Sequence, residues 1–125
     1  MTEEIRLVIP AEEDFRPIVR LVTGGLASRF DLTYDDLEDI QVAVDAVLAL
    51  RDDAGAVTVV LSAEPGNVRA AIGPFEPGVL DPSDASDGRL DLQHVLETVC
   101  DTHELESRED GAWVEITKRT AAVDA

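Results

Sequence analysis

The side chains best suited to bind a transition metal are few in this sequence. His94 and His103 lie nine positions apart, with Cys100 between them. Imidazole and thiolate are ligands that zinc prefers, and a structural zinc site needs four of them. No fourth ligand follows at metal spacing, and a helix would not place His94 and Cys100 on one face. We therefore expect no metal site here, with the histidines at the surface and the cysteine buried.

Acidic and hydroxyl side chains offer two further kinds of chemistry. Residues 81–87 (DPSDASD) are rich in carboxylates, but they lack the glycine and the terminal glutamate of a calcium-binding loop. No serine has the flanking glycines of a nucleophile elbow. The sequence therefore predicts neither a calcium loop nor a serine hydrolase.

The composition limits the kinds of partner. The 125 residues include 27 acidic and 10 basic side chains, so the net charge is −17. This charge repels nucleic acids and anionic membrane surfaces, and it attracts a basic protein partner. Hydrophobic residues make up 45% of the chain, which is enough to form the core of one domain. The acidic start, the single cysteine and the lack of a long apolar run predict a cytoplasmic protein.

A strand and two helices are expected in the N-terminal half. Residues 4–10 (EIRLVIP) alternate in hydropathy, which indicates a strand that ends at Pro10. The first helix should then bury one apolar face, while the glycine pair at 24–25 should bend or fray its later part. The residues expected on that face are Phe15, Ile18, Val19, Val22 and Leu26. Thr33 should cap the second helix, whose apolar stripe is Leu37, Ile40, Val44, Val47 and Leu48.

The sequence of the C-terminal half predicts two hairpins, separated by a loop and a short helix. Residues 56–63 and 68–72 form the first hairpin, and residues 103–109 and 113–118 form the second, around Asp110-Gly111. Between them we expect a surface loop at 73–88 and a helix capped by Asp91. The order β-α-α-β-β-α-β-β predicts an α+β, two-layer sandwich with helices on one face of a mixed sheet. It forms one domain at 1–119, followed by a frayed tail at 120–125.

Two stretches in this arrangement are typical of a known family. They are ASRFDLTYDDLEDIQVAVDAV (27–47) and GAWVEITKR (111–119). With the order of elements, they resemble the anti-sigma factor serine kinases of the RsbW and SpoIIAB type. The resemblance implies the histidine kinase-like ATPase (GHKL, Bergerat) fold over nearly the whole chain. It also implies binding to a sigma factor or an anti-sigma factor antagonist, commonly as a homodimer.

The family's catalytic helix supplies a carboxylate and, four residues later, an amide oxygen, which activate the attacking hydroxyl and hold Mg²⁺. Aligned on Asp45, these two positions are Ala46 and Leu50 in this chain. Neither side chain can accept a proton or bind a cation. Asp45 and Asp52 stay open as substitutes, although neighbouring helix residues point about 100° apart.

The family's nucleotide loops are altered as well. Its Asp-x-Gly-x-Gly loop binds the adenine amino group through the aspartate and approaches the nucleotide through the glycines. The aligned stretch, 68–77, has Ala70 at the aspartate position and Ile72 and Pro74 at the glycine positions. The phosphate-binding turn corresponds to 88–92 (GRLDL), where Asp91 would repel phosphate and an isolated arginine could attract it.

The loss of all three elements predicts that the chain binds no ATP and has no cofactor. Our hypothesis is an anti-sigma-factor-like regulatory protein, a pseudokinase that acts by protein–protein binding. Arg20 is the candidate partner-binding residue, because the family presents an arginine at this place on its first helix. Two alternatives stay open: a divergent active serine kinase that phosphorylates an antagonist, and a structural subunit that pairs with an active relative.

Overall fold

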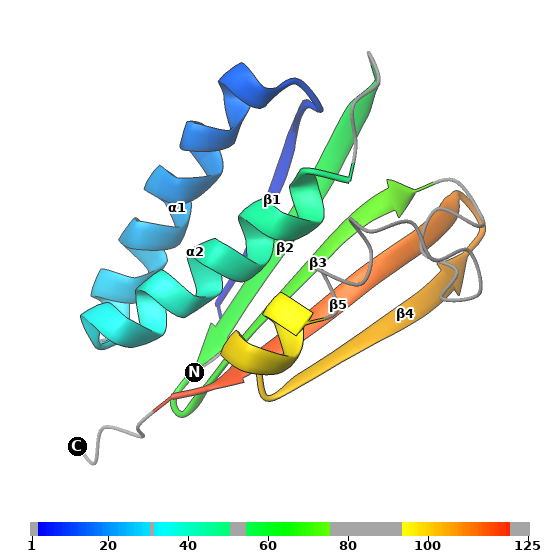
Figure 1. The fold of residues 1–125 in the computed structure, drawn as a ribbon. Coiled ribbons are helices and arrows are strands. Elements are labelled where there is room, and N and C mark those ends of the chain that lie inside the picture. The colour runs from blue at the N-terminus through cyan, green and yellow to red at the C-terminus, as the bar shows by residue number, and fades with distance from the viewer. Residues whose placement is uncertain (1–2, 31, 51–54, 76–93, 121–125) are drawn as a thin grey trace.

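In a computed structural model, the described residues are 3–30, 32–50, 55–75 and 94–120, and they form a sheet covered on one face by helices (Figure 1). In chain order the elements are β1 (Glu3–Pro10), the 3₁₀ helix η1 (Glu13–Phe15), α1 (Arg16–Arg29), α2 (Tyr34–Leu48), β2 (Ala56–Glu64), β3 (Asn67–Phe75), β4 (Thr102–Arg108) and β5 (Gly111–Arg119). Residues 94–99 form a further short helix before β4. The predicted α+β class and order of elements are therefore confirmed.

The five-stranded sheet is antiparallel throughout. Its strand order is β1-β2-β3-β5-β4, and each of its neighbouring pairs is antiparallel. The prediction of a mixed sheet is therefore wrong. The chain does cross over from β3 to β4, and these strands run in the same direction, but β5 lies between them and pairs with both.

The core lies between the helices and one face of the sheet. Successive strand residues point to opposite faces, and most of the buried apolar side chains of the strands fall on the helix-covered face, whereas Trp113 of β5 is buried on the other face. On the three central strands, those on the helix-covered face are Val57, Val59, Leu61 and Ala63 of β2, Val68, Ala70 and Ile72 of β3, and Val114 and Ile116 of β5. On β1, Ile5 and Leu7 are half-buried and Ile9 is buried, as the alternation predicted.

The first helix is continuous, and its buried face differs from the one that the sequence predicted. It continues through both glycines to Arg29, so the expected fraying at 24–25 does not occur. Ile18 is 42% exposed, which corrects its assignment to the core. The buried residues of α1 are Val19, Thr23, Leu26 and Ala27. Thr23 fits among apolar groups because its hydroxyl donates a hydrogen bond to the Val19 carbonyl at 2.7 Å.

The second helix begins and packs as its sequence predicts. The Thr33 hydroxyl accepts a hydrogen bond from the Asp36 backbone N–H at 3.1 Å, which caps the first turn. The expected stripe is confirmed at Ile40, Val44, Val47 and Leu48, which are buried with Ala43. In the described part of the chain, no helix combines the length and the apolar character that a membrane span requires.

Replacing each of two glycines with alanine should change the free energy of unfolding in opposite directions. A methyl group on Gly24 would meet nothing within 4 Å, so Gly24→Ala should raise the free energy of unfolding by about 0.5–1 kcal/mol through helix propensity. On Gly73, the added carbon would lie 2.6 Å from the Trp113 ring. Gly73→Ala should therefore lower the free energy of unfolding by about 1–3 kcal/mol. Urea unfolding of both variants checks the pair, and a stabilising Gly73→Ala would contradict the packing.

Candidate functional site

The positions that the resemblance assigns to catalysis and adenine binding lie on two neighbouring elements. Ala46 is in the last turn of α2, and Leu50 follows the end of this helix. Ala70 and Ile72 lie on β3, and α2 packs across β3 and β5 (Figure 1). The fold therefore brings these positions onto facing sides of the helix layer and the sheet.

On β3, the two positions are part of the hydrophobic core. Ile72 is 0% exposed and Ala70 is 1% exposed. In the sheet, Ile72 lies between Val59 of β2 and Val114 of β5, which are both buried. At the position that the resemblance aligns with a family glycine, this chain therefore has a large side chain with apolar neighbours on both sides. Ala70 offers no side-chain oxygen to an adenine amino group.

At the C-terminal end of α2, Ala46 and Leu50 have no polar side-chain atoms either. Ala46 is half-buried. Leu50 packs against the edge of the core, and its backbone N–H donates a hydrogen bond to the Val47 carbonyl at 3.1 Å. A methyl group and an isobutyl group cannot accept a proton from a hydroxyl or coordinate Mg²⁺. These positions therefore provide neither a general base nor a metal ligand.

The remaining loop positions are only partly described. Pro74 is half-buried and lies inside β3, between Gly73 and Phe75, which are buried. The predicted surface loop at 73–88 is thus wrong for its first three residues, which extend the strand by pairing Phe75 with Ala112 of β5. Residues 76–93, which include Arg89, Asp91 and the rest of that loop, lie outside the described residues, as does Asp52.

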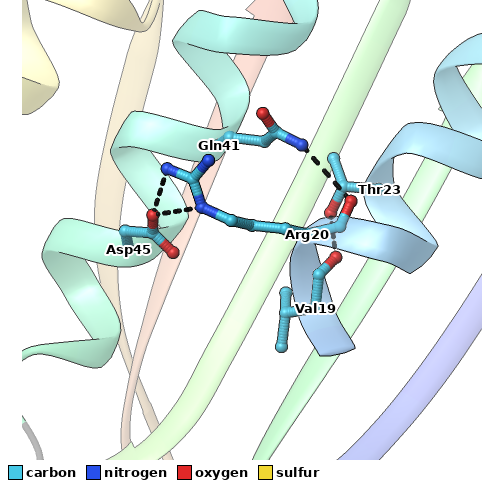
Figure 2. A network of polar contacts seen from close by, with 5 residues as sticks. All are labelled: Val19, Arg20, Thr23, Gln41 and Asp45. Carbon is cyan, nitrogen blue, oxygen red and sulfur yellow. Dashed lines mark hydrogen bonds and ion pairs between the residues drawn. The ribbon is translucent and has the colours of Figure 1, made fainter. Parts of the chain in front are cut away.

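Arg20 and Asp45 form an ion pair that joins the two long helices (Figure 2). The Asp45 Oδ2 atom accepts from Arg20 Nε at 2.8 Å and lies 2.6 Å from Nη2. Gln41 adds a hydrogen bond from its Nε2 to the Arg20 carbonyl at 3.3 Å. The side chain of the candidate partner-binding residue therefore extends along α2, with 51% of its surface exposed.

This ion pair also decides what Asp45 can do. Its carboxylate is directed towards α1, and one of its oxygens is already bound by a guanidinium. Ala46, one residue further on, is the position that the resemblance assigns to the family's base. A pair this exposed contributes at most about 1 kcal/mol to stability. Its main effect is to fix where the Arg20 guanidinium lies.

A further ion pair joins α2 to the sheet, and the sequence did not predict it. Lys118 of β5, the only lysine in the chain, donates from Nζ to Asp39 Oδ2 at 3.0 Å. Burial lowers the pKa of Lys118, but the hydrogen bond and charge of Asp39, with other carboxylates, outweigh this effect and raise it overall. Because 79 positions separate the two residues, local sequence patterns contain no sign of this pair.

The histidines and the cysteine do not assemble a metal centre in the described part of the chain. His94 is exposed, whereas Cys100 and His103 are half-buried. Within the described ranges, no group of three or more histidine, cysteine, aspartate or glutamate side chains could hold a metal ion. Burial raises the pKa of the Cys100 thiol to about 11, and Asp101 and Asp39 add to the effect while Lys118 opposes it. This thiol is therefore protonated at neutral pH.

Comparison with known proteins supports the resemblance. No protein-family model matches the chain. A protein of Halalkalibacterium halodurans named serine-protein kinase RsbW is 48% identical over 42 residues, which cover 34% of this chain and 26% of that protein. A Bacillus cereus (strain AH820) protein of the same name is 27% identical, over 59% of this chain and 60% of that protein. The chain thus spans from about a quarter to three fifths of these relatives.

A solved structure shows the same fold. The crystal structure of the RsbU and RsbW domains of a Mycobacterium tuberculosis protein matches 98% of this chain and 34% of that chain, with a TM-score of 0.66 and 15% identity. The predicted GHKL-type fold is confirmed by this similarity. Together with the sequence matches, it supports the relationship to the RsbW-like anti-sigma factor kinases.

Proposed function

We propose that this relative of the RsbW serine-protein kinases is an anti-sigma-factor-like regulatory protein that acts by binding other proteins, without transferring phosphate. Its partner is a sigma factor or an anti-sigma factor antagonist, and it acts in the cytoplasm. Residues 1–119 form the single GHKL-like domain that does so. In the tail, the Thr120 N–H donates to the Gly66 carbonyl at 3.0 Å, and residues 121–125 lie outside the described residues.

The burial of Ile72 supports the absence of nucleotide binding more than any other observation. A nucleotide base needs an open space and at least one polar partner that recognises its edge. At the family's adenine positions, this chain has two side chains that are at most 1% exposed and have no polar atoms. Removing Ile72 from the core to admit a base would expose apolar surface on two neighbouring strands.

Asp45 is the residue on which an active kinase would depend. A base must approach the hydroxyl from which it takes the proton. Asp45 instead binds Arg20 on the side of α2 that faces α1. The described contacts therefore favour a binding protein over the divergent kinase.

A nucleotide titration tests the proposal. Mg·ATP added to the purified chain up to millimolar concentration should give no heat of binding, and a fluorescent ATP analogue should show no change in fluorescence when the chain is added. The Halalkalibacterium halodurans relative, named as a kinase, is the positive control. Micromolar binding, or transfer of labelled phosphate to an antagonist, would refute the proposal. Loss of that transfer in Asp45→Asn would identify Asp45 as the base of a divergent kinase.

Arg20 should contribute to partner binding. The test is a pull-down from the native host, analysed for sigma factors and their antagonists. Arg20→Ala should reduce the amount of recovered partner at least about fivefold, because the charge-assisted hydrogen bond from Arg20 to the partner is lost. Arg29→Ala is the matched control, since Arg29 also lies on α1 and also pairs with a carboxylate, that of Glu3. Equal loss in both variants would contradict a specific role for Arg20.

A further inference from the structure

We propose that the edge strand β4 binds an extended, basic segment of a partner protein, which adds to the sheet as a further strand beside it. This inference deepens the proposed function, because it rests on action through protein binding and names a site and a kind of segment for that binding. It involves neither Arg20 nor the positions assigned to the nucleotide.

The backbone of β4 has one unpaired edge. The strand lies at the end of the sheet and, in the described part of the chain, pairs only with β5 (Figure 1). Thr102 lies opposite Thr117 of β5, whose carbonyl also accepts from the Asp101 N–H at 3.0 Å and is therefore directed towards β4. Backbone bonding alternates along an antiparallel pair, so the even-numbered residues of β4 bond to β5. The outward-pointing N–H and C=O groups are those of His103, Leu105 and Ser107.

An edge of this kind can bind an extended peptide through main-chain hydrogen bonds, and the side chains beside it determine which peptide fits. On the face of the sheet without helices, the exposed Glu104 lies directly opposite the half-buried Glu115 of β5. Like charges in this position destabilise a strand pair. Among the described residues neither glutamate makes an ion pair, whereas Glu106 binds Arg108 at 3.1 Å. A cation beside Glu104 would therefore relieve a repulsion that the chain alone retains.

The other face of β4 offers an apolar contact. Leu105 points to the helix side of the sheet, because it lies opposite the buried Val114 of β5. Its side chain is 54% exposed, so the described part of the chain covers it only in part. A segment that pairs with β4 places its own side chains on alternate faces. It should therefore have an apolar residue opposite Leu105 and basic residues opposite Glu104 and Glu106.

The turn end of the β4–β5 hairpin is fixed by its own side chains. The Arg108 guanidinium lies over the Trp113 ring, 4.4 Å from its centre, and Trp113 Nε1 donates to Asp110 Oδ1 at 2.9 Å. A strand that is already ordered loses less entropy on binding. The hydrogen bond and charge of Glu106, with the charges of Glu115 and Asp110, outweigh burial and raise the pKa of Arg108. Carboxylates therefore dominate the electrostatics of this region.

A second copy of this chain does not fit the β4 edge. Antiparallel pairing of two β4 strands about Leu105 would place Glu104 of each copy opposite Glu106 of the other, and like charges facing each other oppose such pairing. The net charge of −17 also repels a second copy and attracts a basic protein. The charges of β4 therefore favour a different, basic chain.

Peptide binding measured by fluorescence anisotropy tests the proposal. The probe is a fluorescein-labelled peptide of seven residues, the length of β4, with lysine and valine in alternation. It should bind the purified chain with a dissociation constant below about 100 μM. It should also bind at least about tenfold more tightly than a peptide of the same composition in which all lysines precede all valines, because only the alternating peptide matches both faces of β4.

Glu104→Lys should weaken binding of the alternating peptide at least about tenfold, because it places a cation opposite a cation. Glu4→Lys is the matched control. Glu4 is an exposed glutamate on the other edge strand, β1, and its substitution changes the net charge equally. It should change the affinity by less than about twofold, because a distant exposed charge is screened by salt.

Amide hydrogen exchange followed by NMR locates the bound peptide. Saturating peptide should slow exchange at His103, Leu105 and Ser107 at least about tenfold, because their outward N–H groups become paired. The amides of the even-numbered residues of β4 are already paired with β5 and should change less.

Several results would overturn the proposed site. They are no binding by the wild-type chain, equal binding of the two peptides, equal loss in both variants, or unchanged exchange at the three outward amides. Protection of these amides without peptide would show that a second copy, or another part of the chain, occupies the edge, and would overturn it as well. None of these results affects the nucleotide titration or the pull-down with Arg20→Ala, so the two proposals fail separately.

Discussion

Replacing Ile72 with glycine is expected to lower the free energy of unfolding by about 3–5 kcal/mol, which is a large part of the stability of a small domain. Ile72 is 0% exposed and lies between the buried Val59 and Val114 in the middle of the sheet. The substitution removes its whole side chain from a packed core and leaves a cavity. Glycine also weakens a strand interior, because it orders a more flexible backbone.

Urea unfolding monitored by circular dichroism measures this change, with Ala71→Gly as the control. Ala71 is the preceding residue of β3, is half-buried, and lies on the opposite face of the sheet. Its substitution introduces the same backbone flexibility without a cavity in the core, so it should cost about 0.5–1 kcal/mol. If Ile72→Gly cost no more than Ala71→Gly, the Ile72 side chain would not fill the core, and the main support for an absent ATP site would be lost.

The burial of Ile72 also bears on the nucleotide site that we propose this chain has lost, because it would make the site difficult to regain. The resemblance aligns Ile72 with a family glycine that lets the backbone approach the nucleotide. In this chain, the isoleucine there joins the helix layer to three neighbouring strands, so the same residue now stabilises the fold. Changing Ala46 alone to glutamate would place a carboxylate at a half-buried site, but nothing at Ala70 or Ile72 would then bind adenine.

The sequence predicted those elements whose signals are local. The cap of α2 depends on Thr33 and Asp36, three positions apart, and the structure confirms it. The strand β1 follows from alternation over a few residues, and the turn before β5 from Asp110-Gly111, where Gly111 has a φ of +140°. The family's catalytic and adenine positions were also assigned from sequence. The structure shows how deeply the two on β3 are buried.

The features that the sequence did not predict depend on residues far apart in the chain. Ile18 fits the helical period of α1, but the rotation of this helix is set by its contacts with α2 and the sheet, which leave Ile18 exposed. The pairs Arg20–Asp45 and Lys118–Asp39 join different elements. The antiparallel sheet follows from the position of β5 between β3 and β4, which the order of elements along the chain does not specify.

The thiol of Cys100 should react with iodoacetamide about a hundredfold more slowly at pH 8 than a free thiol does. Burial raises the pKa of this thiol from 9.0 to about 11. The charge of Lys118 lowers the pKa, and the charges of Asp101 and Asp39 raise it, but burial has the largest effect. Only the thiolate attacks the reagent, and its fraction at pH 8 falls by about two orders of magnitude with this shift. Cys100 is the only cysteine in the chain, so mass spectrometry of the intact protein follows this reaction alone.

The pH profile separates a raised pKa from simple steric shielding. For a raised pKa, the alkylation rate of the folded protein should keep rising about tenfold per unit beyond pH 9, where the rate of the urea-unfolded chain levels off. Shielding alone would lower the rate by a constant factor and leave both profiles with the same midpoint, which would contradict the prediction.

The raised pKa of Cys100 also makes the stability of the folded state depend on pH. Because folding raises the pKa, the protonated thiol stabilises the folded state below pH 9. This contribution is lost as the pH rises from about 9 through 11.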